Sequence, residues 1–92
     1  MILRFTDHKG RQLTATLGSN PITIGRSPEA DIQLEDEKAS RIHCEIRKWD
    51  LDFVVKDLQS RNGTFLNEER IGVAVVRMGD ALRIGSTVFH VE

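Results

Sequence analysis

The sequence has few of the features that anchor a small protein covalently or in a membrane. Its single cysteine, Cys44, cannot form an internal disulfide, and no second cysteine or histidine pair stands at the spacing of a zinc site. Its longest apolar runs, such as residues 73–76, are far shorter than the ~20 residues of a membrane-spanning helix. Residues 1–7 lack a charged leader followed by an apolar stretch, so we expect no secretory signal and a cytoplasmic location.

The chain also lacks an excess of charge of either sign. It has 13 Lys and Arg against 14 Asp and Glu, a formal net charge of −1, which argues against a general binder of nucleic acid or membrane surfaces. Its 39% hydrophobic and 29% charged residues exclude a disordered or collagen-like chain. With 92 residues, the sequence predicts one domain over residues 1–92, either a whole protein or the N-terminal module of a longer one.

Alternation of apolar and polar residues predicts several short strands, each with one buried face. Turn signals separate these segments, and strands of this length with a turn every ~8–12 residues are typical of an all-β, antiparallel sandwich or barrel. The residues expected to face inward are Leu13, Ala15 and Leu17; Ile22 and Ile24; Ile32 and Leu34; Phe53 and Val55; Leu82 and Ile84; Phe89 and Val91.

Residues 39–49 fit two interpretations. Ala39, Ile42, Ile46 and Trp49 are spaced three or four residues apart, which is the period of an amphipathic helix. The alternative is a polar loop over residues 35–41 followed by a strand over residues 42–49, with Cys44 and Ile46 inward. The pattern alone does not decide between them.

Three segments that follow or join predicted strands combine turn residues with polar side chains suited to holding an anion. They are GRS at 25–27, SRIH at 40–43 and DLQSRNGT at 57–64; DIQL at 31–34 precedes the second segment, and GDALRIG at 79–85 follows the third. Taken together, they resemble the signature of the forkhead-associated (FHA) domain over essentially the whole chain. One short motif would be weak, but this ordered set is hard to obtain by chance.

The resemblance implies a two-sheet β-sandwich of the FHA/SMAD type, with ligand-binding loops at one end and neither catalysis nor a cofactor. It favours a loop entering a strand over the helix at residues 39–49. It implies recognition of a phosphothreonine-containing protein, a Ser/Thr kinase or its substrate, in kinase signalling, and no nucleic-acid or membrane partner. An alternative is an interaction module of the same fold that does not depend on phosphate and binds through a sheet face or edge.

A phosphothreonine carries about −1.5 to −2 charges near pH 7 and three acceptor oxygens, so its receptor needs converging donors. The residues that match the family motif are Arg26, Ser40, Arg41, Arg61 and Asn62. The resemblance implies that Arg26 bonds the phosphate or the peptide backbone beside it, that Ser40 and Arg41 bond the phosphate, and that Asn62 holds the peptide main chain. Several family members have a threonine in place of Arg61, and others have arginine or lysine. The Arg61 guanidinium would either replace the hydroxyl bond to the phosphate with an ionic one or turn towards an acidic side chain of the peptide.

Other residues of the motifs are expected to support the pocket. These are Gly25, His43, Asp57, Ser60 and Gly63. His43 and Cys44 are neighbours on a strand and point to opposite faces, so they cannot pair as base and nucleophile.

We expect side chains in the loops, Glu29, Asp36, Glu37 and Arg61, to influence peptide selectivity. A further departure from the family lies at residues 66–69, where LNEE replaces a common second Asn-Gly turn and leaves the local turn geometry open.

Overall fold

The computed structural model describes all residues 1–92, and strands and turns form the whole chain. The strands are β1 Ile2–Thr6, β2 Gln12–Thr16, β3 Ile22–Gly25, β4 Ile32–Gln33, β5 Cys44–Trp49, β6 Asp52–Asp57, β7 Thr64–Leu66, β8 Glu69–Ile71, β9 Val73–Val76, β10 Ala81–Ile84 and β11 Thr87–Val91. No helix in the structure has the length and hydrophobicity needed to cross a bilayer.

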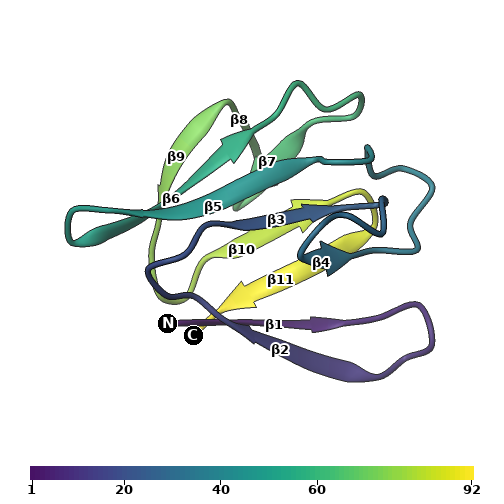
Figure 1. Cartoon of the computed structure of the whole chain (residues 1–92), viewed down its shortest axis with the longest axis horizontal. Helices are drawn as coiled ribbons and strands as arrows, with labels where there is room; N and C mark the ends of the chain where they lie inside the picture. Colours follow the sequence, from purple (N-terminus) through teal and green to yellow (C-terminus); the bar gives the residue numbers. More distant parts are fainter.

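The strands form two sheets that pack into a sandwich (Figure 1). The six-stranded sheet has the order β2-β1-β11-β10-β7-β8, and the five-stranded sheet has the order β4-β3-β5-β6-β9. The predicted all-β sandwich is therefore confirmed. One pairing departs from the antiparallel expectation: β4 runs parallel to β3, with Ile24 opposite Ile32, because residues 26–31 carry the chain back to the side on which β3 begins.

The core lies between the sheets and consists of 14 buried residues. The period-two pattern is confirmed in the central strands, where Leu82, Ile84, Phe89 and Val91 are all buried. Burial of each such side chain stabilises the fold by about 1.5–3 kcal/mol relative to exposure. Leu13 departs from the prediction and is 40% exposed, because β2 is the outer strand of the six-stranded sheet.

Residues 39–49 form a loop followed by a strand, and the helix interpretation is wrong. In strand β5, Cys44 and Ile46 face the core, while Trp49 is 67% exposed. A strand turns residues 46 and 49 to opposite faces, whereas a helix would have placed them together. Ala39 lies in the loop and is nevertheless buried. The first apolar residue of the helix-like spacing therefore packs in the core without a helix.

The loops that carry the predicted binding residues gather at one end of the sandwich. We call the segments 26–31, 34–43 and 58–63 the loop end; the chain termini lie at the opposite end, the terminal end (Figure 1). The terminal end also holds the β5–β6 turn at residues 50–51 and the turn at residues 77–80. The five-stranded sheet delivers the first two loop-end segments, and the third crosses from β6 to β7 in the other sheet.

Candidate functional site

The base of the site is the close approach of the end of β3 to the 40–42 backbone. The Arg26 N–H donates to the Ser40 carbonyl over 2.9 Å, and the Ser27 N–H donates to the Arg41 carbonyl over 3.0 Å. A β-carbon on Gly25 would lie 2.0 Å from the Arg41 carbonyl oxygen. Only glycine therefore allows this contact, which fixes Arg26 beside Ser40.

His43 joins two of the loops from within the core. Its ring is fully buried; the Ser40 N–H donates to its Nδ1 over 3.0 Å, and its Nε2 lies 2.8 Å from the Gly63 carbonyl oxygen. A carbonyl oxygen only accepts, so Nε2 carries the hydrogen and Nδ1 is the acceptor. The neutral ring thus bonds both loops at once and holds Ser40 at a fixed distance from Gly63.

Asp57 organises the third segment through its carboxylate. The Ser60 hydroxyl donates to Oδ1 and the Ser60 N–H to Oδ2, and the Thr64 hydroxyl donates to Oδ1 over 2.7 Å. The Ser60 oxygen in turn accepts the Gly63 N–H over 3.0 Å. Burial raises the pKa of Asp57, but the hydrogen bonds from Ser60 and Thr64 outweigh it and hold that pKa below its ordinary value.

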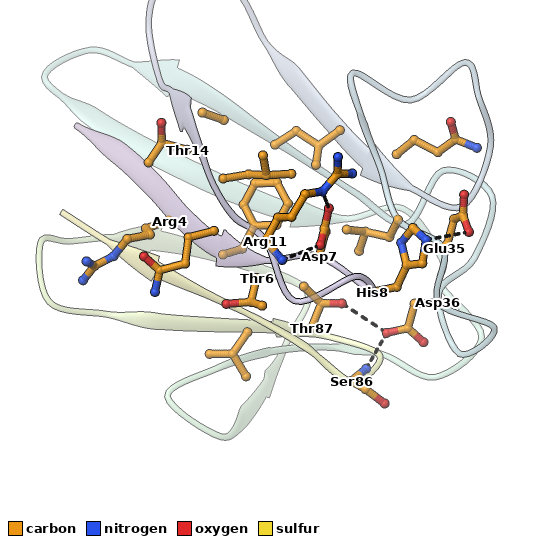
Figure 2. Close-up of a pocket in the computed structure, with 18 of the residues that line it drawn as sticks. Arg4, Thr6, Asp7, His8, Arg11, Thr14, Glu35, Asp36, Ser86 and Thr87 are labelled. Carbon is orange, nitrogen blue, oxygen red and sulfur yellow. Dashed lines mark hydrogen bonds and ion pairs between the residues drawn. The ribbon is translucent and has the colours of Figure 1, made fainter.

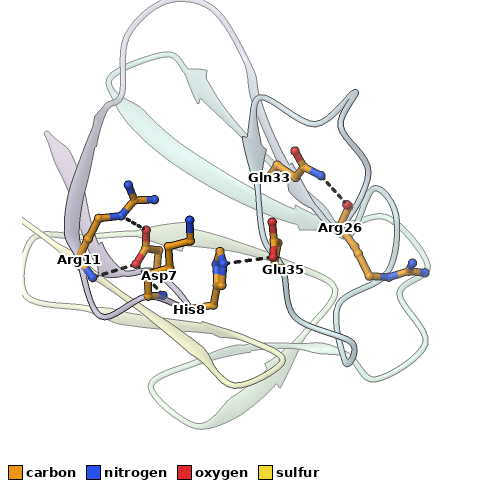
Figure 3. A network of polar contacts seen from close by, with 7 residues as sticks. Asp7, His8, Arg11, Arg26, Gln33 and Glu35 are labelled. Atoms are coloured by element: carbon orange, nitrogen blue, oxygen red, sulfur yellow. Dashed lines mark hydrogen bonds and ion pairs between the residues drawn. The ribbon is translucent and has the colours of Figure 1, made fainter.

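The Arg26 and Ser40 side chains are positioned and keep donors available. The Arg26 Nε donates to the Ala39 carbonyl over 3.1 Å, which leaves the terminal guanidinium nitrogens without a partner, and its side chain extends away from Gln33 (Figure 3). The Ser40 oxygen accepts the Arg61 N–H over 2.9 Å. Because a hydroxyl can accept and donate together, its hydrogen remains free for an anion.

Asn62 connects two loop-end segments. Its Nδ2 donates to the Lys38 carbonyl over 2.7 Å, so one amide hydrogen and the Oδ1 oxygen remain available to another chain. Arg41 and Arg61 are exposed, and their guanidinium groups have no hydrogen-bond or ion-pair partner. The structure therefore brings Arg26, Ser40, Arg41, Arg61 and Asn62 together at the loop end, with the charged donors facing solvent.

Ser40, His43 and Cys44 do not form a catalytic arrangement. His43 accepts the backbone N–H of Ser40 and does not bond its hydroxyl. Burial, together with the negative charge of Asp57, raises the pKa of the Cys44 thiol to about 12, so the nucleophilic thiolate is scarce at neutral pH. The chemistry of the site is that of an anion receptor.

The residues expected to influence selectivity have different surroundings. Asp36 accepts the Ser86 N–H over 2.7 Å and the Thr87 hydroxyl over 3.3 Å, so it fastens its loop to the β10–β11 hairpin (Figure 2). Glu29 and Glu37 are exposed and their carboxylates have no partner. Sequence reasoning missed Thr64, a buried hydroxyl at the end of the NGT motif, and the Lys38 carbonyl, which no side-chain pattern could reveal.

A broad groove lies beside the site. It is a groove of about 1270 Å³ between the β1–β2 hairpin and residues 31–38, and polar side chains line most of it (Figure 2). The His8 Nε2 lies 3.1 Å from a carboxylate oxygen of Glu35 across it (Figure 3). The residues that line the groove do not include Arg26, Ser40 or Asn62, so the predicted binding residues lie outside it.

Comparisons with known proteins agree with this geometry. The profile of the FHA domain matches residues 22–85. The chain is 46% identical over 63 residues to the oxoglutarate dehydrogenase inhibitor of Corynebacterium diphtheriae, a match that covers 68% of this chain and 44% of that protein. The chain spans about half the length of the curated relatives it matches.

Solved structures share the fold over nearly the whole chain. The FhaA FHA domain, solved with the intracellular domain of another protein, superimposes with a TM-score of 0.85 at 32% identity, covering 97% of this chain and 96% of that one. Mycobacterium tuberculosis EmbR, solved with a low-affinity phosphopeptide, has a TM-score of 0.80 at 30% identity, covering 97% and 24%. The matched profile includes every motif of the loop end, and the chain therefore belongs to the FHA domain family.

Proposed function

We propose that this chain is a non-catalytic recognition module that binds phosphothreonine-containing proteins in Ser/Thr kinase signalling. The observation that carries the proposal concerns the side chains of Arg26, Ser40 and Asn62. Each is positioned by one hydrogen bond within the protein and keeps at least one donor hydrogen without a partner. The partner would be a Ser/Thr kinase or its phosphorylated substrate. A cytoplasmic location stays a prediction of the sequence.

Phosphate would bind where the donors of two loops meet. The Ser40 hydroxyl donates one bond, and the Arg26 guanidinium donates charge-assisted bonds from its terminal nitrogens. Arg41 and Arg61 add positive charge from the rim, where their long side chains can move to the ligand. Because these groups are preorganised by the Gly25, His43 and Asp57 contacts, binding orders few side chains and keeps most of the interaction free energy.

Asn62 would hold the peptide main chain beside the phosphothreonine. Its free amide hydrogen donates to a peptide carbonyl, and its Oδ1 accepts a peptide N–H. Its bond to the Lys38 carbonyl fixes the amide plane, so both groups point outward together. Two similar structures support the proposal: EmbR was solved with a low-affinity phosphopeptide, and another belongs to an analysis of phosphothreonine-dependent FHA domain interactions.

Isothermal titration with matched phosphothreonine and threonine peptides tests the proposal. Several bonds to a charged group, at about 1.5–3 kcal/mol each, less the free energy of desolvation and ordering, give an expected dissociation constant near ~1 μM. The unphosphorylated peptide should bind at least ~100-fold more weakly. The double variant Arg26→Ala, Ser40→Ala should lose the difference between the peptides, and Arg77→Ala at the terminal end should keep it. Equal affinity of the wild type for both peptides would refute the proposal.

A second candidate function rests on the outer face of the five-stranded sheet. Trp49 and Val73 are 67% and 62% exposed there, and they line a shallow pocket with Val54. Exposed apolar side chains that lie together favour a protein-interaction surface. Partner binding that survives the Arg26→Ala, Ser40→Ala change and is lost in Trp49→Glu would favour this phosphate-independent function.

A further inference from the structure

Most arginine side chains away from the loop end have a partner. They form ion pairs between Arg4 and Glu92, Arg11 and Asp7, Arg47 and Glu45, and Arg83 and Glu68. The arginines with neither an ion pair nor a side-chain hydrogen bond are Arg41, Arg61, Arg70 and Arg77. Arg41 and Arg61 belong to the loop end, and Arg77 belongs to the terminal end. Arg70 remains to be placed, because its position decides which groups its unpaired guanidinium can contact.

Arg70 lies on strand β8 but reaches the loop end. In the β7–β8 register it stands opposite Phe65, and its side chain leans diagonally toward Gly63. A β-carbon on Gly63 would lie 2.7 Å from the Arg70 Nε and 3.1 Å from its Cζ. Because Gly63 has no side chain, the guanidinium packs over its α-carbon, next to Asn62.

The charges near Arg70 leave its guanidinium free. Glu68, the nearby carboxylate of the β7–β8 turn, is taken by Arg83, whose guanidinium also lies 4.2 Å from the centre of the Phe65 ring. None of the hydrogen bonds that order Arg26 and Ser40 involves Arg70. The loop end therefore carries a cationic donor over Gly63, Arg70, that is separate from Arg26 at its contact with Ser40 and adds to Arg41 and Arg61 at the rim.

We propose that Arg70 selects an acidic side chain near the phosphothreonine of the bound peptide. The inference rests on the proposed function: if Asn62 holds the peptide main chain, the peptide runs past Gly63, and a side chain a few residues from the phosphothreonine comes within reach of the Arg70 guanidinium. A free guanidinium there attracts a carboxylate and repels lysine or arginine. The preferred ligand is then a phosphothreonine peptide with aspartate or glutamate at one flanking position.

A positional scan tests this selection. The probes are phosphothreonine peptides in an alanine and glycine background, with a single aspartate or asparagine at each position within five residues of the phosphothreonine. At one position the wild type should bind the aspartate peptide about three- to fivefold more tightly than the asparagine peptide, as expected for an exposed ion pair. Arg70→Gln should abolish this preference and keep the preference for phosphorylated over unphosphorylated peptide.

Matched variants make the result decisive. Arg70→Lys should keep part of the preference, Arg70→Glu should reverse it toward a lysine peptide, and Arg77→Gln, another unpartnered arginine at the far end, should keep it whole. Thermal unfolding confirms that each variant is folded. The inference is overturned if no position prefers aspartate, or if Arg70→Gln and Arg77→Gln lower affinity for both peptides equally. If the wild type instead binds phosphorylated and unphosphorylated peptides with equal affinity, the proposed function is overturned.

Discussion

The two ends of the sandwich use their polar residues differently. At the terminal end, the polar contacts are exposed to solvent: Asp80 accepts the Arg77 N–H over 2.8 Å and the Asn67 side-chain amide over 3.0 Å, and Arg4 pairs with Glu92. At the loop end, buried groups such as His43 join segments far apart in the chain.

The difference shows how a protein with a net charge of −1 can form an anion receptor. The backbone of the loop end is ordered by a neutral histidine and a carboxylate that bonds hydroxyls, and the only arginine side-chain bond there runs from the Arg26 Nε to the Ala39 carbonyl. The remaining guanidinium nitrogens of the loop-end arginines have no partner, whereas Arg4 at the terminal end pairs with Glu92. Substitutions at the loop end should therefore lower both stability and phosphopeptide affinity, whereas substitutions at the terminal end should have small effects on stability and none on binding.

The largest loss of stability is expected from Gly25→Ala. The added β-carbon meets the Arg41 carbonyl oxygen, a backbone atom that can move only with its whole loop, so we expect a loss of about 3 kcal/mol in unfolding free energy. Phosphopeptide affinity should fall as well. Gly18→Ala, with no atom within 4 Å of the new carbon, should change stability by less than ~0.5 kcal/mol in the same urea titration. Equal losses of stability in the two variants would contradict the close approach of Gly25 to the Arg41 carbonyl oxygen.

The Asp57→Asn variant should lose about 2 kcal/mol at neutral pH, because hydrogen bonds to a charged acceptor are lost. The pKa of Asp57 is lower in the folded than in the unfolded protein, so its stabilisation is complete above the unfolded value of ~3.9 and is lost as the pH falls through the folded pKa. The difference between wild type and variant should therefore shrink in acid.

Chemical unfolding at about pH 7, 4 and 2.5 checks this dependence. Asp52→Asn, at the terminal end of the same strand, is the matched control, because Asp52 is exposed and its carboxylate has no partner. A difference between wild type and Asp57→Asn that stays constant across this range would show that the charge of Asp57 does not stabilise the loop.

Phosphopeptide binding should weaken about five- to tenfold between about pH 7.5 and about pH 5. The reason is that the phosphate of the peptide loses its second negative charge near pH 6. Titration calorimetry at several pH values measures the change. A thiophosphothreonine peptide, which keeps its second charge to lower pH, should lose less affinity. Equal losses for the two peptides would place the titrating group on the protein instead of the ligand.

The smallest effect is expected at the terminal end. Asn67 and Glu68 form the β7–β8 turn with φ of 50° and 67°, and glutamate is strained in this left-handed region. Glu68→Gly should stabilise the fold by about 0.5 kcal/mol, after loss of the exposed pair with Arg83, and leave binding unchanged. Glu68→Gln keeps the strain and should not stabilise. A gain in Glu68→Gln equal to that in Glu68→Gly would show that charge, not strain, controls this turn.

Much of the fold could be predicted, because the alternation of apolar and polar residues is strong in the central strands. Leu82 with Ile84 and Phe89 with Val91 have the expected buried faces. The β7–β8 hairpin carried no glycine signal, since its turn uses Asn67 and Glu68. Strand β1 has the same alternation, and its buried residues Leu3 and Phe5 were not among those predicted to face inward.

The site could be predicted only in part, since it depends on contacts between distant segments. The motifs indicated the polar side chains, but not that the Ser40 oxygen accepts the Arg61 N–H or that Asn62 bonds the Lys38 carbonyl. Arg70 belongs to no motif and reaches Gly63 only through the β7–β8 register. Sequence reasoning finds the residue types, whereas strand register decides which of them meet.

The most direct test of the account is a nuclear magnetic resonance titration of the labelled protein with a phosphothreonine peptide. The account predicts that backbone amide shifts concentrate in residues 25–27, 38–43 and 60–63, with little change at residues 50–51, 67–68 and 77–80. The unphosphorylated peptide should produce almost none. Shifts centred on Trp49 and Val73, or the same shifts with both peptides, would contradict the assignment of the loop end as the phosphate receptor.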